Sequence, residues 1–224
     1  YESVVKPQMK EIEFLFIDLD DTVYPPDTGA WDILGNRIYE FMDKYVGIPM
    51  EIIHEERDRL FHLHGTTMKG LQLEYGADIN QYLDYVHNVD LTGIIVEDLA
   101  LRQVLIKLPQ QKWIFTNASR VHAEQILRLV GVRDLFVEII DVLDTDPYCK
   151  PDPLAFALAL EKAGNPDPTR CLFVDDRAPN LDAAKTLGML TIQVDPSGNT
   201  ADGHITIKKL SDLPLVLDES GLLK

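Results

Sequence analysis

Cysteine and long apolar runs are scarce in this chain, and each scarcity excludes a class of protein. Only Cys149 and Cys171 occur among 224 residues, without metal-type spacing, so a reducing intracellular compartment is the simpler expectation. No run of 18 apolar residues appears, and the first six residues lack the apolar core of a signal peptide. We therefore expect a soluble cytoplasmic protein without a membrane partner, although a chain that begins at Tyr1 need not begin at its native start.

Basic residues are also few, since 21 Lys and Arg face 37 Asp and Glu and the net charge is −16. A nucleic-acid polymer or an anionic membrane needs clustered Lys and Arg, so neither is expected as a partner. An anionic substrate would need a local cation to approach so acidic a protein, which favours a bound metal. The oligomeric state cannot be inferred from these numbers.

Flexible linkers and low-complexity tracts are absent, so the chain is expected to fold throughout. Apolar runs alternate with helical patterns, which predicts an α/β fold with a Rossmann-like parallel sheet and helices on both faces. The predicted strands are 14–17, 113–115, 137–142, 172–174, 190–194 and, at an edge, 205–207.

Two core helices are predicted, at 120–130 and 153–163, from the spacing of their apolar residues. The residues expected on their buried faces are Val121, Ile126, Leu127 and Val130 in the first helix and Leu154, Ala157, Leu158 and Ala163 in the second.

The first strand connection is much longer than a simple crossover, because about ninety residues separate Thr22 from Gln111. Apolar spacing within it predicts helices at 31–45, 51–63 and 79–86, and a helix at 97–107 that returns to the sheet. We therefore expect residues 25–95 to form a helical cap, and 1–24 with 96–224 to form the core.

Acidic residues follow the first predicted strand at Asp18, Asp20 and Asp21. Ligands bind beyond the carboxyl ends of strands in such sheets, so this cluster is expected to lie in a site. One carboxylate can act as a nucleophile while another, held protonated, donates a proton to a leaving oxygen.

A second acidic pair, Asp175 and Asp176, follows a later strand. Two acidic pairs that converge would repel each other, by roughly 4 kcal/mol per charge pair at ~4 Å and an effective dielectric of 20. A hard dication removes this repulsion, and Mg²⁺ suits carboxylates, waters and a phosphate oxygen. The sequence therefore favours a Mg²⁺ cofactor.

Other polar residues stand at comparable places: Thr116 and Asn117 after a strand, Ser119 as a helix cap, and Lys150 before Pro151. Taken singly, each fits an ordinary turn or a solvated surface. In their order along the chain, however, Asp18-Leu19-Asp20-Asp21-Thr22, Thr116-Asn117, Lys150-Pro151-Asp152 and Val174-Asp175-Asp176 resemble the motifs of the haloacid dehalogenase (HAD) superfamily. The resemblance spans about residues 12 to 195.

The resemblance implies a role for each matching residue. Asp18 would be the nucleophile and a metal ligand, and Asp20 the general acid and base whose backbone carbonyl also binds the metal. Thr116, Asn117 and Lys150 would bind the phosphate. The metal carboxylate would come from Asp176, with Asp175 as a direct or outer-shell ligand. Asp20 favours phosphate esters, because superfamily dehalogenases lack this second aspartate.

Within the superfamily, residues 20–25, residues 82–87 and the His64-Gly65 turn resemble pyrimidine 5′-nucleotidase-like members. The candidate substrate contacts are Tyr24, His62, His64, Thr66, Lys69 and His87. The resemblance implies a phosphatase acting on a nucleoside 5′-monophosphate or another small phosphorylated metabolite. Two alternatives stay open: a sugar phosphomutase with the same core, and a phosphate-binding regulatory protein without turnover.

Overall fold

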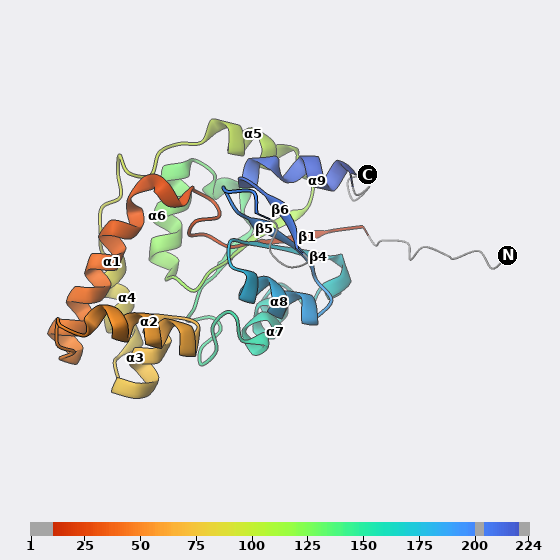
Figure 1. The fold of residues 1–224 in the computed structure, drawn as a ribbon. Coiled ribbons are helices and arrows are strands. Elements are labelled where there is room, and N and C mark those ends of the chain that lie inside the picture. Colours follow the sequence, from red (N-terminus) through yellow and green to blue (C-terminus); the bar gives the residue numbers. More distant parts are fainter. Residues whose placement is uncertain (1–10, 200–203, 220–224) are drawn as a thin grey trace.

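The computed structural model describes residues 11–199 and 204–219, and its centre is a six-stranded parallel sheet (Figure 1). The strand order is β3-β2-β1-β4-β5-β6, so the first strand lies in the middle and β6 lies at an edge. The strands are β1 (Phe14–Ile17), β2 (Gln111–Phe115), β3 (Glu138–Ile140), β4 (Cys171–Asp175), β5 (Leu190–Val194) and β6 (Ile205–Ile207).

Helices pack on both faces of this sheet. The helices α5 (Leu99–Lys107), α6 (Arg120–Val130) and α9 (Leu213–Glu219) contribute side chains to one apolar cluster with β1, β4 and β5. The helices α7 (Pro153–Lys162) and α8 (Ala178–Thr186) contribute to a second cluster, which also contains Phe16, Phe115 and Phe173. The predicted α/β class with helices on both faces is confirmed.

Four helices between β1 and β2 form a third apolar cluster beside the sheet (Figure 1). They are α1 (Ala30–Phe41), α2 (Ile53–His64), α3 (Thr67–Tyr75) and α4 (Ile79–His87). A short π-helix, Met42–Val46, continues α1. Leu91 and Ile95 already pack in the main core, as does Ala30 at the start of α1. The helical cluster thus joins the sheet through two short connections.

Strand positions follow the apolar runs closely. The ranges predicted for β1, β5 and β6 are those observed, while β3 is shorter than the predicted 137–142. The helix α3 was not predicted, because Gly70 and several polar residues interrupt its apolar pattern. Within residues 11–199 and 204–219, no helix is both long and apolar enough to cross a membrane.

The predicted buried faces of two helices are partly wrong. On α6, Val121 is 73% exposed and His122 is buried instead, beside Ile126, Leu127 and Val130. On α7, the prediction fails for Leu154, Ala157 and Leu158, because Ala155, Phe156, Ala159 and Leu160 face the core instead. Ala163, just after the helix, is partly buried against the same cluster, as predicted. Nearly every position of α7 is apolar, so spacing alone could not select its buried face.

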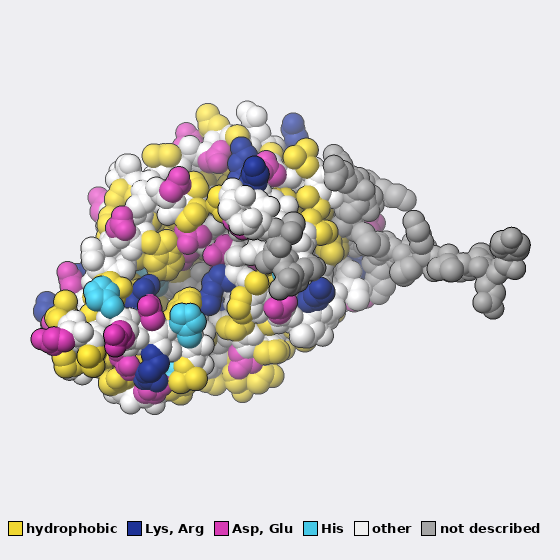
Figure 2. All heavy atoms as spheres, in the orientation of Figure 1, with side chains coloured by type: hydrophobic (Ala, Val, Ile, Leu, Met, Phe, Trp, Pro, Cys, Tyr) yellow, Lys and Arg dark blue, Asp and Glu magenta, His cyan; other side chains and the backbone are white. Residues whose placement is uncertain are grey.

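Charged side chains are scattered over the face seen in Figure 2. Lys and Arg lie among Asp and Glu there and do not gather into one patch.

Candidate active site

Strand register brings the predicted acidic residues together. Ile17 of β1 pairs with Val174 of β4, and the backbone N–H of Asp18 donates to the carbonyl of Val174 at 2.8 Å. Asp18 and Asp175, the next residue on each strand, therefore lie side by side. On the other side of β1, Ile17 pairs with Ile114 of β2, which places Thr116 at the same edge.

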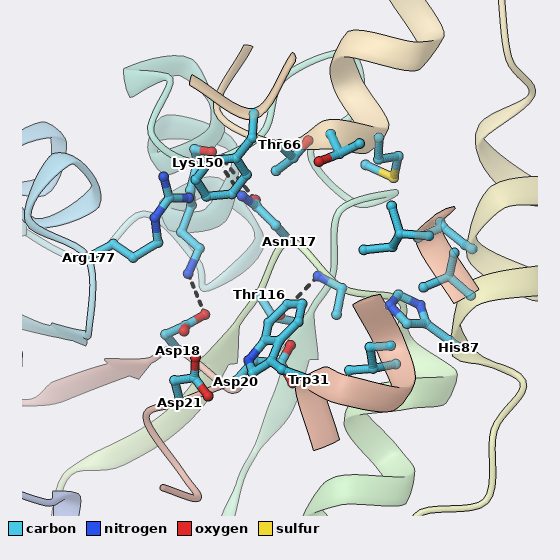
Figure 3. Close-up of a pocket in the computed structure, with 18 of the residues that line it drawn as sticks. Asp18, Asp20, Asp21, Trp31, Thr66, His87, Thr116, Asn117, Lys150 and Arg177 are labelled. Carbon is cyan, nitrogen blue, oxygen red and sulfur yellow. Dashed lines mark hydrogen bonds and ion pairs between the residues drawn. The ribbon is translucent and has the colours of Figure 1, made fainter. Parts of the chain in front are cut away.

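Lys150 joins the two acidic strand ends, and Figure 3 shows its contact with Asp18. Its Nζ donates to Asp18 Oδ1 at 2.6 Å and to Asp175 Oδ2 at 2.8 Å, and the side chain is almost wholly buried. The rings of Phe115 and Phe173 lie 5.2 Å and 5.3 Å from the ammonium. Lys150, which taken singly would fit a solvated surface, is therefore a buried counter-ion.

Asn117 fixes the backbone of Lys150 from both sides. Its Nδ2 donates to the carbonyl of Lys150 at 2.9 Å, and the N–H of Lys150 donates to its Oδ1 at 2.9 Å. The hydroxyl of Thr116 accepts a bond from the N–H of Ala118 at 3.0 Å, which leaves its own proton to donate. The Asn117 side chain thus positions Lys150, whereas Thr116 retains a donor.

Three carboxylates, those of Asp18, Asp175 and Asp176, place oxygens within 4.8 Å of one another. Burial raises the pKa of Asp18 to about 7, against the opposing charge of Lys150. Burial, Asp18 and Asp175 raise the pKa of Asp176 to about 8. When all three carboxylates are ionised, the single ammonium leaves an excess of two negative charges, which a dication would balance. The donor set consists of oxygens alone, so the residues fit Mg²⁺.

Asp175 and Asp176 differ in how many hydrogen bonds their carboxylate oxygens already accept. Asp175 accepts bonds from Lys150, from Asn180 at 2.9 Å and 3.0 Å, and from the N–H of Arg177 at 2.9 Å. Asp176 borders the cavity described below and, among the described residues, accepts no side-chain hydrogen bond. Its carboxylate is therefore the more available of the two for a cation.

The carboxylate of Asp20 is held by two buried side chains. Tyr24 Oη donates to Asp20 Oδ1 at 2.6 Å, and His122 Nε2 lies 2.8 Å from the same oxygen. Burial by itself would raise the pKa of Asp20, but the imidazole of His122 and the two hydrogen bonds together lower it. Sequence reasoning missed His122, although shifting the predicted face of its helix by one residue would have turned it inward.

The site opens into a cavity of about 420 Å³ between the sheet edge and the helical cluster (Figure 3). Asp18, Asp20, Lys150 and Asp176 line it on one side. Side chains from the helical cluster line the other side: Trp31, Leu34, Ile38, Arg57, Phe61, Thr66, Thr67, Met68, Tyr82, Leu83, Val86 and His87. This second wall is mainly apolar.

Of the predicted substrate contacts, Thr66 and His87 line this cavity, whereas Tyr24, His62, His64 and Lys69 do not. Tyr24 is bound to Asp20, His64 Nε2 lies 2.5 Å from Glu74 Oε1, and Lys69 Nζ donates to Gln72 at 2.7 Å. Each has a partner elsewhere. Arg177 does line the cavity, and its guanidinium lies over the ring of Phe61 at 4.2 Å.

Comparisons with known proteins find relatives in sequence and in fold. A curated relative, phosphate metabolism protein 8 of Saccharomyces cerevisiae, is 26% identical over 190 residues, which cover 78% of this chain and 59% of that protein. Phosphatase MT3486 of Mycobacterium tuberculosis is 35% identical over 105 residues, which cover 47% of this chain and 46% of that protein. The chain thus spans roughly half of the length of these two relatives.

A solved structure shares the fold. The HAD phosphatase from Thermococcus onnurineus superposes with a TM-score of 0.63 at 17% identity, over 92% of this chain and 98% of that chain. The family model described as haloacid dehalogenase-like hydrolase matches residues 12–188, which include β1 to α8 and every acidic residue of the site. The chain belongs to the haloacid dehalogenase-like hydrolase family.

Proposed function

We propose that this chain is a Mg²⁺-dependent phosphomonoester hydrolase that forms a phosphoenzyme on Asp18. The observation that carries the proposal is that Asp18 and Asp20 open onto one cavity while buried Lys150 pairs with Asp18. A nucleophile, a proton donor and a fixed cation are the groups that phosphoryl transfer requires. The names of both curated relatives are consistent with phosphate chemistry.

In the first half-reaction, a carboxylate oxygen of Asp18 attacks phosphorus and the bond from phosphorus to the ester oxygen breaks. Asp20 gives its proton to that departing oxygen, so the product leaves as a neutral alcohol. The lowered pKa of Asp20 favours its ionised form in the free protein. A bound phosphate places negative charge beside Asp20. This charge raises the pKa of Asp20, so the carboxylate takes up a proton.

In the second half-reaction, water attacks the phosphorus of the aspartyl phosphate. Asp20, now ionised, takes the water proton, and the bond from phosphorus to Asp18 breaks to release inorganic phosphate. Lys150 balances the charge of Asp18 and the phosphoryl group throughout, since its ammonium is held in place by Asp175. Thr116 is positioned to donate its hydroxyl proton to a phosphate oxygen, and Asn117 acts by fixing Lys150.

Mg²⁺ fits the three carboxylates of Asp18, Asp175 and Asp176. The backbone carbonyl of Asp20 would be a further oxygen ligand, as the resemblance implies. When bound, Mg²⁺ would supply charge neutralisation for phosphate and carboxylates. The free oxygens of Asp176 support it as a direct ligand. The four hydrogen bonds to Asp175 support an outer-shell role for that residue.

We further propose that residues 25–95 act as the cap, and 1–24 with 96–224 as the catalytic core. The separate apolar cluster of α1 to α4, which walls the cavity opposite Asp18, supports this division. Such a wall excludes water and selects the leaving group. Its apolar lining, with Trp31 at 37% exposure, suits the ring of a nucleoside 5′-monophosphate.

The first experiment is a phosphatase screen of the purified protein over nucleoside monophosphates and sugar phosphates, with Mg²⁺ and with a chelator. We expect Mg²⁺-dependent release of phosphate, with UMP and CMP preferred. A preference for sugar phosphates would remove the nucleotidase assignment, and isomerisation without free phosphate would indicate a phosphomutase. If no ester were turned over, the alternative of a phosphate-binding regulatory protein without activity would be favoured.

A variant pair tests the nucleophile. Asp18→Asn should abolish turnover and leave no hydroxylamine-sensitive phosphate on the protein after an acid quench, whereas wild type should carry it. Asp21→Asn is the matched control, because the same change is made three residues away, where φ is +59° and asparagine is tolerated. It should retain most activity. Wild-type turnover in Asp18→Asn would contradict the assignment.

A further inference from the structure

Two buried residues outside the cavity wall converge on a single oxygen of Asp20. Tyr24 Oη and His122 Nε2 lie 2.6 Å and 2.8 Å from Asp20 Oδ1. Tyr24 is 4% exposed and His122 is fully buried. Neither lines the cavity, whereas Asp20 does, so any effect they have on a reaction must pass through Asp20.

The imidazole of His122 is itself held in place. An ionised carboxylate only accepts hydrogen bonds, so Nε2 is the protonated ring nitrogen. Among the described residues, Nδ1 is buried without a hydrogen-bond partner. The ring of His87 stacks on that of His122 with centroids 4.6 Å apart, and Nδ1 of His87 lies 2.8 Å from Ser119 Oγ. Ser119 is the N-cap of α6, which carries His122.

Both contacts fall on Oδ1, and this asymmetry has a chemical consequence. Within the described part of the chain, no hydrogen bond reaches Oδ2 of Asp20. A carboxyl group free to rotate about its terminal torsion would present either oxygen in varied directions. With Oδ1 fixed by two donors, Oδ2 is left as the oxygen that can carry the proton.

We propose that Tyr24 and His122 are positioning residues that fix the carboxyl group of Asp20, so that Oδ2 exchanges the proton with the ester oxygen and with water. The inference rests on the proposed phosphatase function and extends it to residues that lie behind the general acid. It also accounts for a buried histidine that packing alone does not require, since an apolar side chain would fill the same space on α6.

The test uses the dependence of rate on the leaving group. A 4-nitrophenolate leaves without a proton, whereas the alkoxide of an alkyl phosphate needs one. Tyr24→Phe and His122→Leu should lower kcat/KM for an alkyl phosphomonoester by about 10- to 100-fold. They should change kcat/KM for 4-nitrophenyl phosphate by less than about threefold. A general structural defect would lower both values alike and would overturn the proposal.

Two further variants complete the design. His122→Gln keeps an N–H donor near the position of Nε2, so it should recover most of the alkyl-ester rate if the residue acts by donating to Oδ1. Asp20→Asn should show the same leaving-group signature at larger amplitude. If Asp20→Asn shows the signature but Tyr24→Phe and His122→Leu do not, the positioning proposal fails and the proposed function stands.

If Asp20→Asn affects both esters equally, the acid role itself fails. Failure of His122→Leu to fold, judged by circular dichroism and thermal melting, leaves the decision to Tyr24→Phe, which removes one hydroxyl and keeps the ring. Equal rates for wild type and Tyr24→Phe on the alkyl ester would then overturn the proposal.

Discussion

At the scale of single residues, Lys150 is buried between Asp18 and Asp175 and pairs with both carboxylates. Lys150→Met leaves two buried carboxylates without their cation, so we expect the free energy of unfolding to fall by about 3–5 kcal/mol. Phosphatase activity should fall at least ~100-fold, because charge stabilisation of the transferring group is lost. Urea denaturation and steady-state kinetics measure the two effects.

The chain offers a matched control for that variant. Lys112 is also buried, but its Nζ donates to the carbonyls of Leu108 and Gln110 near the amino end of β2, away from the site. Lys112→Met should therefore lower stability without a comparable loss of activity. Equal losses of activity in the two variants would contradict the role given to Lys150.

His87 gives the protein a pH dependence that can be isolated. Burial and the neighbouring His122 lower the pKa of His87 to about 3, from 6.5 in an unfolded chain. Between these values the unfolded chain takes up a proton that the folded protein does not, so the free energy of unfolding falls as the pH is lowered from about 6.5 towards 3. Because the ring is partly exposed, we expect protonation of His87 to account for about 1–2 kcal/mol of this loss in the free energy of unfolding.

The measurement compares wild type with His87→Gln by urea denaturation at pH 7 and pH 4. The difference in the free energy of unfolding between wild type and His87→Gln should shrink by about 1–2 kcal/mol from pH 7 to pH 4. His62→Gln changes an exposed histidine and should show no such shrinkage. An advantage that grows as the pH falls would show that the sign of the linkage is wrong.

At the scale of elements, the turn between α2 and α3 meets the segment that carries Lys150. Gly65 has φ +82°, and a Cβ there would lie 2.8 Å from Pro151 Cδ and 3.1 Å from the carbonyl oxygen of Lys150. Arg177 Nη1, at the start of α8, donates to the carbonyl of Gly65 at 3.1 Å. The helical cluster is thus seated directly on the catalytic loops.

Gly65→Ala should therefore lower the free energy of unfolding by more than the backbone strain at a positive φ alone would. Gly76 provides the comparison, because its φ is +68° and a Cβ there would meet nothing within 4 Å. We expect Gly76→Ala to lower the free energy of unfolding by about 1 kcal/mol, and Gly65→Ala by about 1–3 kcal/mol more. Activity should fall about tenfold only in Gly65→Ala, because Lys150 is displaced. Similar values for both variants would show that the contact with Pro151 is unimportant.

At the scale of the whole molecule, the charge excess of the site should couple metal binding to global stability. Mg²⁺ at 100 times its dissociation constant should raise the free energy of unfolding by about 2.7 kcal/mol, because only the folded chain brings Asp18, Asp175 and Asp176 together. Thermal melting with Mg²⁺ and with a chelator measures this. Asp176→Asn should abolish most of the shift, and Asp43→Asn, which neutralises an exposed acid, should preserve it. A shift equal in both variants would place the cation elsewhere.

The sequence by itself determined the order of strands and helices along the chain. It also determined which types of side chain follow each strand. Apolar runs such as Phe14–Ile17 and Leu190–Val194 must be buried, so their positions are fixed locally and were predicted with the observed bounds. Asp18, Lys150 and Asp176 could be named because their order along the chain resembles a known set of motifs.

Only the tertiary structure decided which of these groups touch. His122 meets Asp20 across 102 residues of sequence, and the choice between Val121 and His122 as the buried residue depends on how α6 rotates against the sheet. The side chains of His64 and Lys69 found partners within the helical cluster instead of the cavity. Residue types and spacing are local properties, whereas burial and hydrogen-bond partners depend on packing between segments far apart in the chain.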